Sequence, residues 1–165
     1  MKNRTIIKFL LILILLLLPL YAKADIAINS SNFPDDKFKT LLINCDTNTD
    51  GKLSDEEIAA INEIATSDEI YDLTGIEYLT ELGSLTLWNS RLTALDLSKN
   101  TKLTSLRIDE SSITEIDFSS NPNLTNLVLG WNHSLSKINI RKNVKLTHLS
   151  VFYSNISELD VRVCF

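Results

Sequence analysis

The sequence predicts an α/β solenoid, mostly β, with a small helical cap at its N-terminal end. Apolar residues recur every 21 or 22 positions between Leu82 and Val161, in six columns that stay in step over four copies. Each copy begins with L-x-x-L-x-L, the sequence signature of a leucine-rich repeat. A helix-loop-helix pattern with EF-hand spacing precedes the copies. We therefore expect about four coils of 21–22 residues over positions 79–165 and an EF-hand-like cap over 25–78.

The coils must stack because one coil alone cannot bury its apolar face. The copies begin at Leu82, Leu103, Leu124 and Leu146. Each coil therefore supplies the core of the next. The head of each copy and the later L-T-x-L-D-L segment both alternate apolar and polar residues, as a β-strand does. Each coil should contain a main strand and a second, short extended segment on its other side.

Polar residues also recur in two columns. Asparagine in the first column predicts a ladder that satisfies backbone groups in turns, because buried polar groups need hydrogen-bond partners. The second column, mostly aspartate, is expected at solvated strand positions, with a metal-binding ladder as the alternative. The columns are Asn100, Asn121 and Asn143, and Asp96, Asp117, Asn139 and Asp160.

The first 24 residues are typical of a secretory signal peptide. Three basic residues precede the apolar run Phe9–Leu20, and an A-x-A cleavage site ends at Ala24. A membrane anchor is the weaker alternative, because about a dozen apolar residues are fewer than the roughly 20 needed to cross a bilayer. The leader carries four basic residues and no acidic ones, so cleavage would change the net charge from −5 to −9. A secreted or cell-surface acidic protein is expected, which argues against nucleic acid or an anionic membrane as partner.

A helix is predicted over NFPDDKFKTLLINC, positions 32–45. Pro34 suits its first turn, Asp35 and Asp36 suit its positive N-terminus, and Phe38 begins an apolar face. A second helix is predicted after the loop, where an S-x-x-E capping box precedes the apolar residues Ile58, Ala59, Ile61 and Ile64.

The loop between these helices predicts a calcium site. It reads DTNTDGKLSDEE and matches the EF-hand pattern D-x-[DN]-x-[DN]-G-x5-E without a gap. Calcium takes six to eight oxygen ligands, and Gly51 permits the sharp turn that wraps them around one point. The alternative is a loop that keeps the EF-hand shape without binding metal. The candidate ligands are Asp46, Asn48, Asp50, the backbone carbonyl of Lys52, Ser54 (directly or through water) and Glu57.

The helix-loop-helix, the stretch IYDLTGIEYLTELGSLTL and the repeats together resemble the internalin family and related bacterial surface leucine-rich-repeat proteins. The matching stretches are NFPDDKF, LTGIEYL and the L-x-x-L-x-L repeats, which cover essentially the whole chain after the leader. The repeats look closer to the 21-residue LTxLDLSxN type of bacterial secreted proteins than to the 22-residue internalin form. The resemblance implies a truncated EF-hand-like cap over the first repeat and protein–protein binding at a cell surface. It does not identify the partner.

The outward positions of the main strands are the candidates for partner binding. They differ from coil to coil, whereas the opposite segments repeat Thr, Asp and Ser. Several are large aromatic residues, which dominate binding hot spots when exposed. The alternative is that these rings lie flat on their neighbours. The candidates are Trp88, Arg107, Asp109, Trp131, His148, Phe152 and Tyr153.

Two competing functions are weaker. An enzyme is not expected, because neither His133 nor His148 belongs to a catalytic or metal motif and neither cysteine has a C-x-x-C context. A dockerin-like module, in which calcium loops assemble an extracellular complex, is the alternative to a leucine-rich-repeat binding module. It would need a second loop of similar ligand spacing, and the sequence has only one.

The end of the sequence departs from the repeat. After Leu159-Asp160-Val161 the chain reads Arg-Val-Cys-Phe, so Cys164 takes the asparagine position of the earlier copies. Solenoids need a polar terminal repeat, so we expect this chain to be part of a longer repeat protein. Cys45 and Cys164 should lie too far apart for a disulfide. Stacked strands are about 4.8 Å apart and several separate the two residues, whereas bridged Cα atoms are roughly 4.4–6.8 Å apart.

Overall fold

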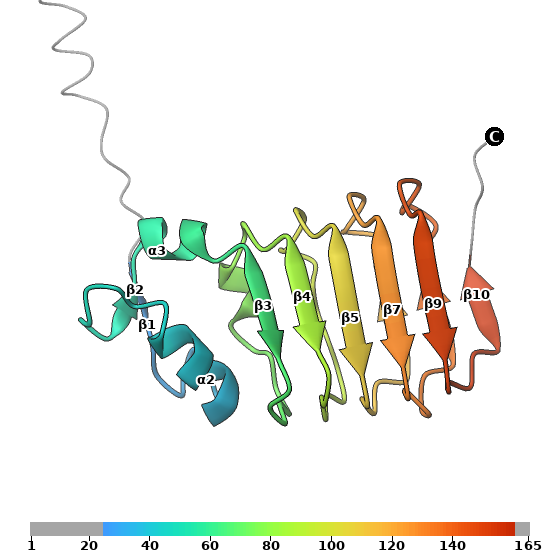
Figure 1. Ribbon diagram of the computed structural model, residues 1–165, viewed down its shortest axis with the longest axis horizontal. Helices are drawn as coiled ribbons and strands as arrows, with labels where there is room; N and C mark the ends of the chain where they lie inside the picture. The colour runs from blue at the N-terminus through green and yellow to red at the C-terminus, as the bar shows by residue number, and fades with distance from the viewer. Residues whose placement is uncertain (1–24, 161–165) are drawn as a thin grey trace, which may run out of the picture.

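The coils stack side by side into an elongated solenoid, with the helical cap at its N-terminal end (Figure 1). The computed structural model describes residues 25–160. One face of the solenoid is a sheet of parallel strands in the order β3-β4-β5-β7-β9. Its strands are β3 (Glu63–Thr66), β4 (Ser84–Leu87), β5 (Ser105–Asp109), β7 (Asn126–Gly130) and β9 (His148–Phe152).

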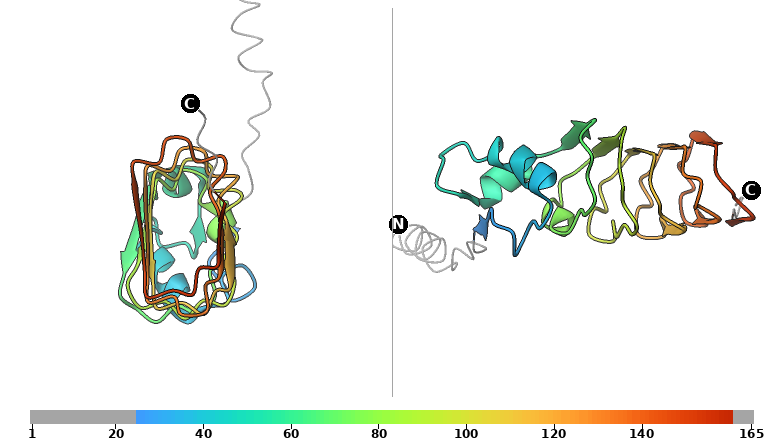
Figure 2. Two further views of the ribbon diagram at one scale, coloured as in Figure 1. Left: turned by 90° about the vertical axis from the view of Figure 1, so that its right-hand side faces the viewer. Right: turned by 90° about the horizontal axis from the view of Figure 1, so that it is seen from below.

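A second, smaller sheet lies on the opposite side of the coils (Figure 2). It contains β6 (Glu115–Asp117), β8 (Lys137–Asn139) and β10 (Glu158–Asp160), all parallel, in the order β10-β8-β6. The predicted second extended segment is therefore confirmed in three coils. The equivalent segment of the first copy, residues 94–97, is not a strand.

The apolar columns fill the space between the two sheets. Leu85, Leu106 and Leu127 are fully buried, as are the columns on either side of them. In the last described coil, the corresponding Leu149 is 37% exposed because no further described coil covers it. The repeat prediction is confirmed, and its physical basis is that each coil is buried by its neighbours.

The large sheet begins earlier in the chain than the sequence analysis predicts. Five parallel strands are present where about four coils were expected, and β3 lies within the range 25–78 assigned to the cap. The helix expected to include Ile61 and Ile64 is α3 (Asp55–Ala60), which ends before both residues. Ile64 instead pairs with Leu85 of β4. The strand is favoured because the edge of β4 would otherwise present unpaired N–H and C=O groups.

The cap packs directly on the first coil. It contains α2 (Asp36–Ile43), α3 and an antiparallel pair, β1 (Ile26–Ala27) with β2 (Lys52–Leu53). The buried ring of Phe33 meets Phe38 and Tyr78 edge-on at 5.9 Å, and Tyr78 belongs to the 3₁₀ helix η1 (Ile76–Tyr78). One continuous core therefore runs from the cap into the coils.

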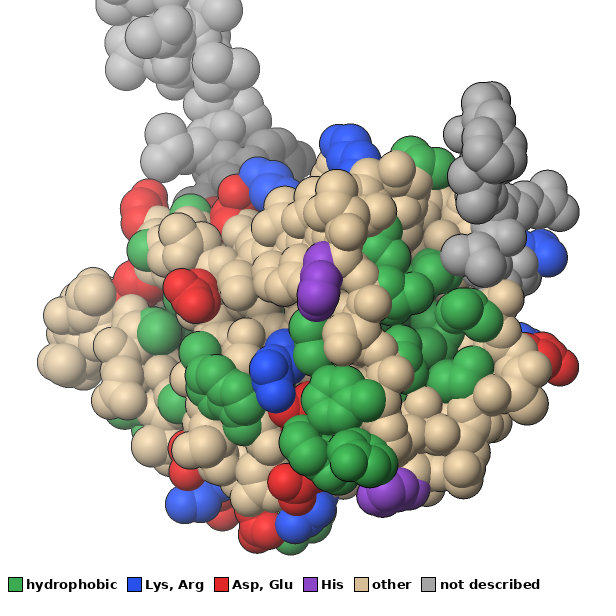
Figure 3. Space-filling view, turned by 45° about the vertical axis from the view of Figure 1, so that its right-hand side comes forward, with side chains coloured by type: hydrophobic (Ala, Val, Ile, Leu, Met, Phe, Trp, Pro, Cys, Tyr) green, Lys and Arg blue, Asp and Glu red, His purple; other side chains and the backbone are tan. Residues whose placement is uncertain are grey.

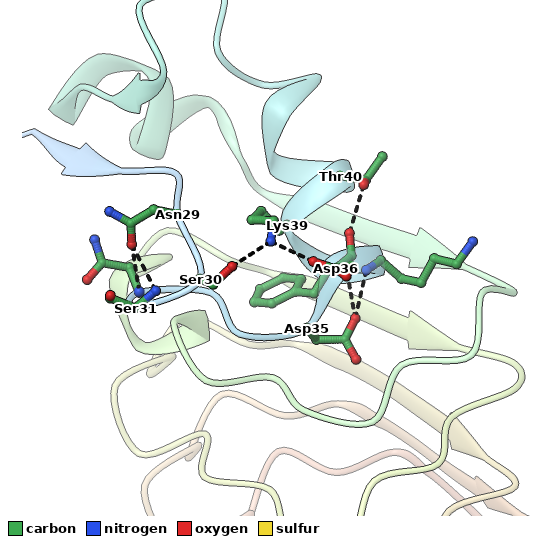
Figure 4. Close-up of polar contacts among 10 residues, drawn as sticks. Asn29, Ser30, Ser31, Asp35, Asp36, Lys39 and Thr40 are labelled. Atoms are coloured by element: carbon green, nitrogen blue, oxygen red, sulfur yellow. Dashed lines mark hydrogen bonds and ion pairs between the residues drawn. The ribbon is translucent and has the colours of Figure 1, made fainter.

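The first helix begins differently from the prediction. Asp35 is the N-cap of α2, since its Oδ1 accepts hydrogen bonds from the N–H groups of Lys37 and Phe38, so Pro34 precedes the helix. Lys39 Nζ lies 2.6 Å from Asp36 Oδ1 and donates to Ser30 Oγ at 2.9 Å, which ties the helix to the preceding segment (Figure 4).

The asparagine ladder is confirmed. Asn121 Nδ2 donates to the carbonyl oxygens of Leu97 and Asn100, both at 3.0 Å, and Asn100 and Asn143 repeat this arrangement. Three members of the other polar column, Asp117, Asn139 and Asp160, are the last residues of β6, β8 and β10, which confirms the predicted strand positions, whereas Asp96 is not in a strand. Asp96 and Asp117 each accept a hydrogen bond from the N–H two residues later, at 2.8 Å. The bond from Ser98 lowers the pKa of Asp96.

Some predictions fall outside the described residues. The leader over positions 1–24 and the departure from the repeat after Val161 are among them, and so is Cys164. Cys45 is half-buried with a free thiol, and desolvation followed by the nearby Glu57 raises its pKa. Within residues 25–160, no helix has the length and hydropathy to span a membrane.

Candidate functional site

The outward side of the large sheet brings most of the predicted partner-binding residues to one end of its strands. Arg107 is level with Thr86, Val128 and Ser150 in the neighbouring strands. Two residues further along, Asp109, Gly130 and Phe152 form the last row of the sheet. Trp88, Trp131 and Tyr153 directly follow β4, β7 and β9. His148 is exposed at the start of β9, at the opposite end of that strand from Phe152.

Three aromatic side chains form a cluster, which we call the aromatic cluster: Trp131, Phe152 and Tyr153. Trp131 stacks on Tyr153 with ring centroids 5.4 Å apart and planes 18° apart, and Phe152 meets Trp131 edge-on at 4.9 Å. The rings do pack on one another, yet Trp131 remains 43% exposed and Tyr153 64% exposed. Trp88 is 45% exposed, and its ring contacts no other aromatic ring among the described residues. Figure 3 shows apolar side chains in patches, with charged side chains between two of them.

The two exposed rings of the cluster sit on left-handed backbone. Glu110, Trp131 and Tyr153 occupy equivalent positions of successive coils and have φ values of 62°, 53° and 53°. Such values are uncommon for residues other than glycine and cost roughly 1–3 kcal/mol each. Hydrogen bonds between coils hold the first two, since the N–H of Glu110 donates to Gly130 O and that of Trp131 donates to Phe152 O, both at 3.0 Å. The repeat therefore fixes where this column presents its side chains.

Asp109 is not an exposed binding residue, contrary to the prediction. It is 2% exposed, although it points outward from β5 by the alternation that also exposes Arg107. Its Oδ2 accepts hydrogen bonds from Arg107 Nε and Nη2 at 2.8 and 2.6 Å, and its Oδ1 accepts one from the Gly130 N–H at 3.1 Å. Burial of a carboxylate is tolerated here because it is paired with a cation and fully hydrogen-bonded.

Gly130 is a residue that the sequence analysis missed. A Cβ at this position would overlap the Phe152 ring and lie 2.7 Å from Asp109 Oδ1. The absent side chain therefore leaves room for the ring on one side and for the carboxylate on the other. The signal in the sequence was a glycine in a column otherwise occupied by Trp88, Asp109 and Phe152.

The cap loop holds its shape through carboxylates that accept hydrogen bonds from the backbone. Glu57 Oε1 accepts from the N–H and the hydroxyl of Thr47, both at 2.7 Å, and Oε2 accepts from the Ser54 N–H at 2.9 Å. Ser54 Oγ in turn accepts from the Glu57 N–H, so the predicted capping box is confirmed. Asp46 Oδ2 accepts from the N–H of Gly51, whose φ of 80° explains the glycine. The hydrogen bonds from Ser54, then from Thr47, lower the pKa of Glu57 to about 2.

The types of oxygen ligand in this loop suit a hard cation, but the directions of its side chains do not. Three carboxylates, an amide, a hydroxyl and a carbonyl oxygen are the groups that calcium prefers. The described part of the chain nevertheless contains no group of three or more His, Cys, Asp or Glu side chains placed to hold a metal ion. Glu57 is directed at the N–H groups of Thr47 and Ser54, and Asn48 Oδ1 and Asp50 Oδ1 accept from the N–H groups of Asp50 and Lys52.

Solved structures of two internalins from Listeria monocytogenes are similar to this chain. The functional domain of InlJ, which includes a cysteine ladder, matches with a TM-score of 0.63 and 27% identity over 86% of this chain. The internalin InlF matches with a TM-score of 0.60 and 23% identity over 82% of this chain. The fold is an internalin-like leucine-rich-repeat solenoid. No protein-family model and no curated protein matches the sequence.

This chain is shorter than the proteins it resembles. The matches cover 36% of the InlJ structure and 48% of the InlF structure. The buried polar column of the described coils consists of Asn100, Asn121 and Asn143.

Proposed function

We propose that this chain is a secreted or cell-surface module that binds a protein through the outward side of the β3-β4-β5-β7-β9 sheet. The observation that carries the proposal is the contrast between columns that repeat and columns that vary. Thr104, Thr125 and Thr147 repeat because each hydroxyl donates to a carbonyl of the preceding coil, at 3.0–3.1 Å. The outward positions have no such shared side-chain bond, and most of them differ from coil to coil, with Ser84 and Ser105 as an exception.

The varied positions include the side chains that contribute most to protein interfaces. Trp, Tyr and Arg are enriched among binding hot spots, and Trp88, Trp131, Tyr153 and Arg107 all lie at this end of the sheet. Large exposed apolar groups gathered on one face indicate an interaction surface. Export is supported by the leader-like sequence before residue 25 and by the likeness to internalins.

The test is a paired comparison of double variants against a partner captured from cell-surface or extracellular protein. Trp88→Ala with Trp131→Ala should weaken binding at least about tenfold, because each removes a potential hot spot. Ile43→Ala with Val144→Ala is the control, since both residues are exposed and apolar but lie outside the outward strand positions. Circular dichroism would verify the fold. Equal binding by both double variants and the wild type would refute the surface.

A second proposal is that the cap loop binds calcium and is stabilised by it. The ligand types and the order of Asp46, Asn48, Asp50, Lys52, Ser54 and Glu57 support it. The lowered pKa of Glu57 keeps that carboxylate charged and available to a cation. These residues would hold the ion, and Glu57 would exchange its hydrogen bonds with Thr47 for it. This role leaves the solenoid as the recognition surface, whereas a dockerin-like module would use the loop itself.

Thermal melts in calcium and in chelator test this second proposal. Extracellular calcium modules have a Kd of roughly 10⁻⁴–10⁻³ M, and free calcium at about ten times Kd would stabilise the fold by about 1.4 kcal/mol. Asp46→Ala and Glu57→Ala should abolish the shift. A wild type that melts identically in both buffers would show that the loop keeps its shape without metal.

A further inference from the structure

We propose that Arg107 is preset to bind a single carboxylate of the protein partner, an Asp or Glu side chain flanked by apolar residues, with Asp109 as its positioning residue. The inference rests on the proposed protein-binding function and names the chemistry that this surface recognises. Its basis is the geometry of Arg107, Asp109 and Gly130, because these three residues fix a half-exposed cation at the centre of the binding face.

The anchor of Arg107 is buried while Arg107 itself faces solvent. The side chain of Asp109 is 3% exposed and that of Arg107 is 36% exposed. Asp109 cannot turn away, because its other oxygen accepts the N–H of Gly130 and the Phe152 ring lies against the same glycine. The guanidinium therefore has one orientation set by the fold, and a partner would lose little conformational entropy in ordering it.

The guanidinium retains unused donors on its outer edge. Arginine has five N–H donors in a planar fork. Asp109 Oδ2 takes the one on Nε and one on Nη2, which leaves both donors of Nη1 and one of Nη2. No other hydrogen bond from the Arg107 side chain occurs among residues 25–160. The Nη1–Nη2 edge is the one that matches a carboxylate through two parallel hydrogen bonds.

The surroundings favour one carboxylate over a polyanion. Asp109 neutralises much of the charge of Arg107, and the whole chain carries a net charge of −5, which repels nucleic acid and anionic surfaces. The exposed Trp88 and the aromatic cluster offer apolar contacts at the same end of the sheet. An acidic side chain between aromatic or aliphatic residues satisfies both features.

Arg91 provides a matched control in the same part of the molecule. Its Nη1 lies 3.4 Å from Glu110 and its Nη2 lies 3.4 Å from Glu69, so both outer nitrogens already face carboxylates. Those two acids are exposed and no buried carboxylate holds Arg91. The outer edge of Arg91 is thus occupied, whereas that of Arg107 is open.

The first experiment is a selection of random 12-residue displayed peptides on the mature protein and on Arg107→Lys and Arg91→Lys. Lysine keeps the charge but lacks the fork. Wild type and Arg91→Lys should enrich peptides with one Asp or Glu beside aromatic or aliphatic residues. Arg107→Lys should enrich apolar peptides without that preference. For a selected peptide, wild type should prefer the acidic form to its Gln or Asn twin roughly tenfold to a hundredfold, and Arg107→Lys less than about threefold.

The second experiment tests the positioning role of Asp109. In Asp109→Asn, Arg107 is retained but loses its charged anchor, so the preference for the acidic peptide should fall by roughly tenfold. The Arg107 Nε–H signal in NMR spectra should lose its protection from solvent exchange, which a purely structural effect elsewhere would not cause. If this variant fails to fold, the Arg107→Lys comparison alone decides.

The outcomes separate the two proposals. Peptides that bind wild type without any preference for acid, or an acid preference that survives Arg107→Lys, would overturn the carboxylate inference and leave the binding surface intact. If Trp131→Ala selects the same peptides as the wild type, the peptides bind elsewhere on the molecule. That result would overturn both the proposed function and the inference.

Discussion

The cap loop and the coils satisfy their backbone groups in opposite ways. In the loop, charged carboxylates accept hydrogen bonds from N–H groups, and Glu57 reaches residues up to ten positions away. In the coils, neutral amides and hydroxyls donate to carbonyls of the preceding coil, 21–25 positions earlier. The first arrangement is local and depends on ionisation. The second is long-range and its donors do not titrate, so acid should loosen the cap loop while leaving the asparagine ladder intact.

The largest effect is expected when a ladder asparagine is made into an acid. Asn121→Asp replaces two hydrogen bonds with a buried carboxylate that faces the carbonyl oxygens of Leu97 and Asn100. The free energy of unfolding at pH 7 should fall by about 3 kcal/mol or more in urea titrations. Burial would raise the pKa of the new carboxyl in the folded state. Stability should therefore recover as the pH is lowered and be lost as it rises through that pKa.

Two variants calibrate that result. Asn121→Ala leaves the two carbonyls unpaired without adding a charge, and should cost about 2 kcal/mol. Asn123→Asp changes a half-buried asparagine two residues further on, whose bond to Thr101 O is exposed, and should cost less than about 1 kcal/mol. Equal losses for Asn121→Asp and Asn123→Asp would show that the ladder is not a main source of stability.

Acid should destabilise the cap loop, whereas it should restore the stability of Asn121→Asp. The pKa of Glu57 is about 2 in the folded protein and 4.5 in its ordinary range. Its stabilising contribution is therefore complete above about pH 4.5 and is lost as the pH falls toward 2. The protection factors of the Thr47 and Ser54 amides, which compare the observed exchange rate with that of an unfolded chain at the same pH, should fall over this window in the wild type. In Glu57→Gln these protection factors should already be low at pH 7 and should change little as the pH is lowered.

The exposed neighbour Glu56 supplies the control for this experiment. Glu56→Gln should reproduce the wild-type exchange profile. If Glu57→Gln also reproduces it, the carboxylate is not what holds the loop.

The smallest effect is expected at the exposed aspartate that ends a strand of the small sheet. Asp117→Ala removes acceptors for the Ser119 N–H and for Asn139 Nδ2, both in contact with water. Water can replace such bonds, so the loss should be within about 1 kcal/mol in a thermal melt. A loss as large as that of Asn121→Ala would erase the distinction between buried and exposed polar columns.

The repeat and its buried columns could be predicted because a 21-residue period is a property of the sequence itself. The asparagine ladder followed for the same reason, since a polar residue that recurs in register must have a recurring partner. Strand β3 could not be predicted, because Ile58, Ile61 and Ile64 are spaced three apart and fit a helical face. Pairing with β4, a contact with residues about 20 positions later, decided the conformation.

The sequence indicated on which side of its strand Asp109 lies, but not how deeply its side chain is buried. Alternation along β5 places Asp109 outward, on the same face as Arg107, but does not show that it is buried. Arg107 in the same strand lies over it, and the backbone of Gly130, 21 residues later, lies beside it. The second contact depends on how the coils stack and could not be foreseen from the residues near Asp109. The same limit applies to the calcium loop, where ligand order is visible in the sequence but the direction of the Glu57 carboxylate is not.

The asparagine ladder also determines how the protein would respond to mechanical load. The ladder bonds and the strand pairs all connect one coil to the next, so they lie along the axis on which the coils stack. Tension applied between the two ends would therefore load one inter-coil contact at a time, as in a zipper, rather than all of them in parallel. Each rupture would release 21 or 22 residues, about 70 Å of extended chain, and the force record would show a series of similar steps.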